Sequence, residues 1–88
     1  MPHFIRQLED ECVRESEVAE FVVEVQPPDA SVTWFIDDNE VSQNEKYQLT
    51  TYGSVHVLEI YDTTQKDRAT VSAKVGQERT VAELIVEG

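Results

Sequence analysis

The sequence contains only one cysteine, three glycines and one tryptophan among its 88 residues. A single thiol, Cys12, cannot close a disulfide within the chain, although small secreted domains commonly depend on such links. No Asn-x-Ser/Thr site occurs, no apolar run approaches the roughly 20 residues of a membrane-spanning helix, and no charged-then-apolar leader opens the chain. These absences favour a reducing, cytoplasmic setting, with no signal peptide and no membrane insertion.

Basic residues are also scarce in this chain. Seven lysines and arginines face 18 aspartates and glutamates, for a net charge of -11. Because such a surface repels phosphate backbones and acidic lipids, we expect no nucleic-acid partner. The acidic residues crowd the first third of the chain, and two interpretations stay open: a coat that keeps the domain in solution, or a docking face for a basic partner.

The inventory of reactive groups is equally small. Neither His3 nor His56 has a cysteine or a second histidine at zinc-ligand spacing, and no glycine-rich loop precedes a helix to hold a phosphate. The acidic neighbours of Cys12 disfavour a reactive thiolate there. We interpret Cys12 as a small strand residue and His56 as an inward-facing packing residue. The chain is therefore predicted to be no enzyme and to hold no cofactor.

One acidic run deserves a separate test as a metal site. The segment Asp37-Asp38-Asn39-Glu40 carries oxygen ligands of the kind that calcium prefers. Its spacing lacks the alternation of a calcium-binding loop, and carboxylates on turns usually accept local backbone hydrogen bonds. We therefore predict a turn here and no metal site.

Alternation of apolar and polar residues with a period of two is the dominant pattern. The run AEFVVEVQ, residues 19–26, sends one set of side chains to a core and the other to solvent, as a half-buried strand requires. Turn residues such as Pro27-Pro28 and Gly76-Gln77 separate the runs. The pattern predicts strands at 3–8, 10–14, 17–26, 31–37, 46–51, 54–61, 68–75 and 78–87, a short extra strand near 40–42, and one helical turn within 63–67.

Seven or eight short strands at this spacing indicate an all-β sandwich of two antiparallel sheets, with a small barrel as the alternative. The position of Trp34 favours the sandwich. It lies in the middle of a strand on the inward phase, where a large indole fills the gap between two sheets. The length allows one domain, which we place over residues 1–88 and expect to be a piece of a larger multidomain protein.

Five elements in order carry a resemblance to a known family. They are Ala-x-Phe-x-Val-x-Val (19–25), Pro-Pro-Asp-Ala-x-Val-x-Trp (27–34), Leu-x-Ile-x-Asp (58–62), Asp67-x-Ala69 and Ala82-x-Leu84-x-Val86. From Phe4 to Val86, the chain resembles an intermediate-set (I-set) immunoglobulin domain. It is most similar to the domains of giant muscle proteins of the titin, twitchin and obscurin kind.

The resemblance gives several residues a structural role. Trp34 matches the core tryptophan of the third strand, Leu58 lies in the Leu-x-Ile-x-Asp strand, and Asp67 begins the Asp-x-Ala turn before the sixth strand. We expect these three residues, with Val23 and Ala73, to form the core signature of the domain.

Three positions depart from the family pattern. Val23 and Ala73 stand where the family often has its two cysteines, and Val71 stands where a tyrosine commonly makes a corner hydrogen bond. A disulfide is worth roughly 2–5 kcal/mol in other small domains, and the tyrosine bond about 1 kcal/mol. We therefore predict a sandwich with no intramolecular disulfide, as suits a domain that folds in the cytosol.

The resemblance implies a structural and protein-interaction module of a sarcomeric giant protein, acting as a spacer and docking site. Its partners would be other proteins, such as cytoskeletal or sarcomeric domains and neighbouring domains of the same chain. Two alternatives stay open. One is a regulatory domain that flanks a kinase or exchange-factor domain in the same polypeptide. The other, less favoured without a disulfide, is a cell-surface adhesion or receptor domain.

The candidate partner surface comprises Phe35, Val81 and Ile85, which lie on the outward phase of their strands. They share one face if the third and seventh strands lie in one sheet, as the resemblance implies, and an exposed aromatic among apolar neighbours is typical of a contact patch. The alternative is that a loop covers them, or that they are ordinary scattered surface residues.

Two further features are weaker candidates. Val22 and Val57 should face outward on the other sheet, but acidic residues flank them. The edge strand that holds Cys12-Val13 could accept a partner strand, although the charges of Glu11 and Arg14 also discourage unwanted pairing.

Overall fold

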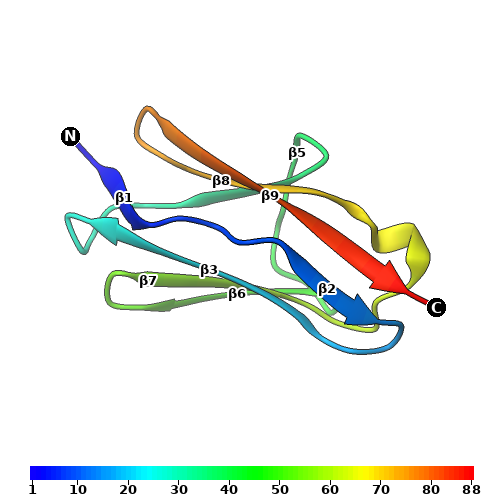
Figure 1. Ribbon diagram of the computed structural model, residues 1–88. Coiled ribbons are helices and arrows are strands. Elements are labelled where there is room, and N and C mark those ends of the chain that lie inside the picture. Colours follow the sequence, from blue (N-terminus) through cyan, green and yellow to red (C-terminus); the bar gives the residue numbers. More distant parts are fainter.

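The computed structural model describes all 88 residues as two β-sheets packed face to face (Figure 1). One sheet has four strands in the order β1-β3-β7-β6 and the other has five in the order β2-β9-β8-β4-β5. The strands are β1 (His3–Arg6), β2 (Glu11–Arg14), β3 (Ala19–Gln26), β4 (Thr33–Ile36), β5 (Asn39–Glu40), β6 (Tyr47–Tyr52), β7 (Val55–Ile60), β8 (Ala69–Val75) and β9 (Glu78–Glu87). The predicted sandwich is therefore confirmed and the barrel is excluded.

The only helical segment is one 3-10 turn, η1 (Gln65–Asp67), within the predicted range 63–67. Every predicted strand is present, and its ends agree with the prediction within two residues. This agreement follows from the period-two pattern, because every second residue of β3 and β9 is buried while those between are less so. No helix in the structure has the length and apolar character needed to span a bilayer.

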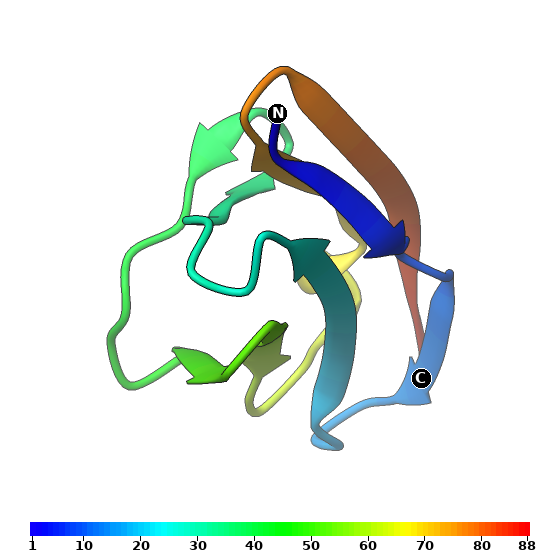
Figure 2. The ribbon, with the colours of Figure 1, turned by 90° about the vertical axis from the view of Figure 1, so that its left-hand side faces the viewer.

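The direction of one strand pairing could not be read from alternation. β2 runs parallel to β9, with Glu11 opposite Leu84 and Arg14 opposite Glu87, while every other pairing is antiparallel. The chain crosses from the four-stranded to the five-stranded sheet between β1 and β2, which puts the first two strands on different layers (Figure 2).

The space between the sheets is filled by one cluster of 13 buried apolar residues. Trp34 lies directly opposite Ala73 on the neighbouring strand β8, and both belong to this cluster with Val23 and Leu58. Val23, Ala73 and Leu58 are fully buried. The two positions where the family often has cysteines are thus filled by apolar side chains, and the free thiol of Cys12 lies elsewhere, on the surface.

The turn before β8 is held by polar contacts centred on Asp67. Its Oδ2 accepts hydrogen bonds from the Thr64 backbone N–H at 2.8 Å and from the Lys46 ammonium at 2.8 Å. Lys46 also donates to the Asp62 carbonyl oxygen at 3.0 Å. Val71, where the family tyrosine would stand, is fully buried in the core. In the absence of a tyrosine hydrogen bond, Lys46 therefore links the start of β6 to the turn before β8.

His56 is the one polar core residue that lacks a full set of partners. It is buried on the inward side of β7 as predicted, and its Nδ1 lies 3.3 Å from the Thr51 hydroxyl. Its Nε2 is buried without a hydrogen-bond partner. Burial lowers the pKa of His56 below its usual value of about 6.5, because the charged imidazolium loses its hydration.

Replacement of the central indole tests the packing account. We expect Trp34→Ala to lower the free energy of unfolding by about 3–5 kcal/mol, because it removes buried surface and leaves a cavity. Val81→Ala, on the exposed side of β9, should change it by no more than about 0.5 kcal/mol. Urea unfolding followed by circular dichroism measures both, and equal effects of the two substitutions would contradict the account.

The lowered pKa of His56 predicts a loss of stability in mild acid. Below about pH 6.5 the unfolded chain takes up a proton at this histidine that the folded chain resists. The free energy of unfolding should therefore fall as pH drops from 7 towards the folded-state pKa, by at most about 1.4 kcal/mol per pH unit. His56→Gln should remove this component, whereas His3→Gln, at an exposed position, should retain it. An unchanged pH profile in His56→Gln would contradict the prediction.

Candidate functional site

The outward face of the five-stranded sheet carries all three residues of the candidate partner surface. Phe35 on β4 lies opposite Ser72 on β8, and Ser72 lies opposite Val81 on β9, so that Phe35 and Val81 occupy one row across the face. Ile85 lies on the same side of β9 but four residues further along, opposite Cys12. Glu83 interrupts the apolar surface between Val81 and Ile85. The structure therefore brings Phe35 and Val81 into one row and leaves Ile85 apart from them.

The ring of Phe35 is half-buried because an arginine covers it. The Arg79 guanidinium lies 4.8 Å from the ring centroid and donates to the Ser72 hydroxyl at 3.3 Å. It also lies 3.6 Å from an oxygen of Asp38. A cation–π contact at such an exposed site is worth roughly 0.5–1 kcal/mol. Sequence reasoning missed Arg79, although its outward phase on β9, two residues before Val81, was a usable signal.

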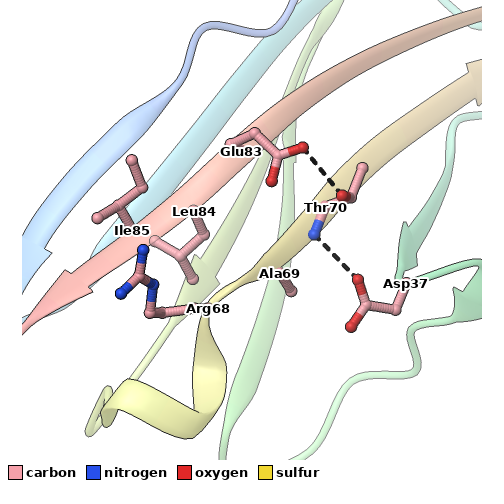
Figure 3. Close-up of a pocket in the computed structure, with 7 residues that line it drawn as sticks. All are labelled: Asp37, Arg68, Ala69, Thr70, Glu83, Leu84 and Ile85. Carbon is pink, nitrogen blue, oxygen red and sulfur yellow. Dashed lines mark hydrogen bonds between the residues drawn. The ribbon is translucent and has the colours of Figure 1, made fainter.

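A shallow hollow of about 340 Å³ opens on the same face, at the Ile85 end (Figure 3). Two carboxylates on one side of it are held by a single residue. The Thr70 N–H donates to Asp37 Oδ1 at 3.0 Å and the Thr70 hydroxyl donates to Glu83 Oε1 at 2.9 Å. Arg68 lies on the opposite side, beside Leu84 and Ile85. This arrangement places charges of both signs around the hollow.

The acidic turn beside this hollow uses its carboxylates locally. Asp37 and Asp38 both have left-handed backbone angles, with φ of 48° and 65°. Asp37 accepts the Thr70 bond, whereas Asp38 lies beside Arg79. No group of three or more histidine, cysteine or acidic side chains is arranged to hold a metal ion. The two aspartates therefore serve the turn and its neighbours.

The thiol of Cys12 lies in an environment that suppresses its reactivity. It is exposed on β2 and donates a hydrogen bond to Glu87 Oε1 at 3.3 Å. This bond, followed by partial burial and the negative charge of Glu87, raises the pKa of the thiol. A nucleophilic cysteine requires a lowered pKa. The arrangement around Cys12 is therefore the opposite of the one that catalysis needs.

The outward side of the four-stranded sheet carries a pair of facing carboxylates. Glu20 on β3 lies directly opposite Glu59 on β7, a like-charge pairing that destabilises a sheet. Burial, followed by the charges of Glu20 and Glu9, raises the pKa of Glu11. Burial and the neighbouring Glu59 likewise raise the pKa of Tyr61. Glu20 therefore lies close enough to act on Tyr61 of the same face and on Glu11, which belongs to β2 of the other sheet.

The apolar centre of that second face is less exposed than its outward phase suggested. Val22 and Val57 lie opposite each other and point away from the core, as expected from alternation. Val57 is nevertheless only 8% exposed. Its place on an inner strand, between Val22 on β3 and Thr50 on β6, explains the difference, because neighbouring side chains cover it from both sides.

Comparison with known proteins places the chain in a family. Residues 2–86 match the model of the immunoglobulin I-set domain. The chain is 35% identical over 86 residues to titin of Drosophila melanogaster. The aligned region covers 98% of this chain and, to the nearest per cent, 0% of that protein. It is 33% identical over 84 residues to cardiac-type myosin-binding protein C of Mus musculus, covering 93% of this chain and 7% of that protein. The chain thus spans less than a tenth of each of these relatives.

Solved structures give the same result. Domain I10 of titin superposes with a TM-score of 0.93 at 26% identity, covering 98% of each chain. Domain I81 of titin superposes with a TM-score of 0.90 at 19% identity, over 99% of this chain and 97% of that one, which shows the shared fold alone. With the two-sheet topology and the match over residues 2–86, these likenesses show that the chain belongs to the immunoglobulin I-set domain family.

Proposed function

We propose that this domain is a structural spacer and docking module of a sarcomeric giant protein in the cytoplasm of muscle cells, with residues 1–88 forming one domain of a longer chain. The proposal is supported by the relatives, which are titin, a myosin-binding protein and the muscle M-line assembly protein unc-89 of Caenorhabditis elegans. The last is 29% identical to this chain over 91 residues.

The observation that carries the spacer role is the placement of the two ends. The molecule measures 41 × 20 × 19 Å, and its N- and C-terminal residues lie at opposite ends of the long axis (Figure 1). Domains joined through such ends would extend a chain by about their own length each. Tension along that chain would act first on β1, which pairs with β3, then on β2 towards the N-terminal end, and on β9 towards the C-terminal end.

The parallel pairing of β2 with β9 determines how the domain responds to that tension. The two strands run side by side along the long axis, and their pairing continues beyond β2 to a hydrogen bond between the Glu15 N–H and the Glu87 carbonyl. Opposite pulls on two parallel strands load all of these bonds together. Pulls across a hairpin would instead break the bonds one at a time, so this geometry suits a domain that bears load.

The docking role rests on the outward face of the five-stranded sheet. Val81 shares a row with Phe35 and is 53% exposed, Arg79 reaches Phe35 from the neighbouring row, and Ile85, further along β9, is 38% exposed. Arginine and aromatic residues are enriched at protein interfaces, where they often carry much of the binding energy. The partner on this face would be another protein domain, either from the sarcomere or from the same polypeptide.

Single-molecule stretching of a tandem array of this domain tests the spacer role. Alternation along β2 from the Glu15 bond turns the Val13 N–H towards β9, so Val13→Pro removes a bond that carries load. We expect a clear drop in the unfolding force for Val13→Pro. Cys12→Ser, whose side chain points outward at the neighbouring position, should unfold at the original force. Equal forces for Val13→Pro and the unchanged domain would contradict a load-bearing β2–β9 pair.

Pulldown from muscle extract tests the docking role. We expect the unchanged domain to retain a sarcomeric protein that the double variant Phe35→Ala/Val81→Ser loses, because the variant removes the apolar row. Val18→Ser, which alters an exposed apolar residue outside that row, should bind as before. Retention of the same partner by the double variant would exclude this face as the docking site.

A further inference from the structure

The two sheets present four strand edges, and three of them are protected against pairing with another chain. β1 has an irregular register between Phe4 and Arg6, β2 carries charges at Glu11 and Arg14, and β5 has only two residues. Irregularity, charge and shortness are the usual means by which proteins prevent strand addition. The fourth edge, β6, has none of these protections.

β6 is a six-residue strand, YQLTTY, that contains no charged residue and no proline. It belongs to the uncharged run 47–58, the longest in a chain of which 28% is charged. β6 lies at the rim of the four-stranded sheet and pairs only with β7 (Figure 1). An uncharged edge strand of this length is a ready template for a further strand.

The backbone groups of β6 that point away from β7 are only partly satisfied. The Lys46 carbonyl accepts a hydrogen bond from the Tyr61 N–H, so the backbone groups of residue 46 point towards β7. Because backbone groups alternate in direction along a strand, those of residues 47, 49 and 51 point away from β7, in the plane of the sheet. Asn44 bonds both backbone groups of Tyr47, and the Gln43 side chain caps the Leu49 N–H at 3.2 Å.

The remaining outward groups are the Leu49 carbonyl and both backbone groups of Thr51. No hydrogen bond from the preceding loop reaches them. An added strand in antiparallel register would bond Thr51 through its N–H and its C=O at once, as ladders of this kind do. The second half of β6 therefore offers hydrogen-bond donors and acceptors in the spacing of a β-ladder.

A hollow continues this edge towards the other sheet. It measures about 380 Å³ and lies where the chain passes from β5 to β6, lined among others by Ile36, Val41 and Tyr47. Figure 2 shows the same side of the sandwich, where a long loop joins the two sheets. This hollow lies beside the capped first half of β6; inward side chains of a strand added at the second half would instead lie beside Leu49, which packs against the core.

The charges beside the edge indicate the composition of the partner segment. Glu59 on β7 lies opposite Gln48 of β6 on the outward face, and Glu20 lies opposite Glu59 on the other side. Outward side chains of an added strand would lie about 10 Å from Glu59, with β6 between them. At low salt, basic side chains at these positions would be attracted to the carboxylates of Glu59 and Glu20.

We propose that the free edge of β6 binds an extended segment of another protein, with basic side chains alternating with apolar ones, as an additional strand. A second copy of this chain is a poorer occupant, because each copy carries a net charge of -11. The proposal requires neither load on β2–β9 nor binding at Phe35.

The probe is a synthetic peptide of about seven residues in which lysine and valine alternate, long enough to lie along β6. We expect its titration into the 15N-labelled domain to shift the amide signals of β6 and to protect the Thr51 amide from hydrogen exchange. A glutamate–valine peptide of equal length should do neither. A lysine–valine peptide with alternate N-methyl groups has the same charge but cannot form the ladder, and it should leave the Thr51 amide unprotected.

Two substitutions locate the site within the domain. Thr51→Pro removes the outward N–H, at the kind of edge position where proline is tolerated, and should weaken peptide binding about fivefold, as expected for one backbone hydrogen bond. Thr51→Ser keeps both the N–H and the hydroxyl that lies 3.3 Å from His56 Nδ1, and should bind normally. Glu59→Gln should weaken the binding of the lysine–valine peptide and make that binding less dependent on salt.

Several results would overturn the proposal. They are absence of lysine–valine binding at millimolar peptide, equal binding of the glutamate–valine peptide, and shifts confined to residues outside β6. Protection of the Thr51 amide by raising the concentration of the domain alone would show that a second copy occupies the edge. If Thr51→Pro does not fold, the N-methylated peptide decides the same question on the unchanged domain.

Discussion

Contact between the inward-facing side chains of the two sheets is the interaction on which the rest of the structure depends. Trp34 and Ala73 lie side by side in one sheet, and Val23 and Leu58 belong to the other. All four are buried in one cluster without a covalent cross-link between the sheets. Burial of apolar surface is worth roughly 25 cal/mol per Å², and this term has to offset the conformational entropy of about 88 ordered residues. A core of this kind leaves both outer faces and the edge of β6 available for other roles.

The outer surfaces divide these roles between them. The five-stranded sheet presents Phe35 beneath Arg79 with Val81 in the same row, whereas the four-stranded sheet presents facing carboxylates at Glu20 and Glu59. The parallel pair β2–β9 would carry a force applied between the two ends of the long axis. The strand β6 is the one edge without protective charge or irregularity. Load, docking and strand addition would therefore involve different surfaces, so that one could act without disturbing another.

Much of the fold followed from alternation, because a strand with one buried face must repeat every second residue. The pattern could not reveal the parallel direction of β2 and β9, since direction leaves alternation unchanged. It also could not foresee the burial of Val57, which depends on its place between two neighbouring strands. The outward direction of Phe35, Val81 and Ile85 could be predicted from alternation. The contact of Arg79 with Phe35 could not, because it joins neighbouring rows on strands that are far apart in the sequence. The open edge at Thr51 required the strand order, which no local pattern contains.

Native-state hydrogen exchange tests the central claim most directly, because it measures the free energy of opening residue by residue. If packing between the sheets holds the fold together, the slowest amides should lie in the inner strands β3, β7 and β8. They should share one opening free energy, equal to that of global unfolding and unchanged in a Cys12→Ser variant under reducing conditions. Exchange of these inner strands at a lower free energy than the edge strands β2 and β6, or a fall in their protection in Cys12→Ser, would contradict it.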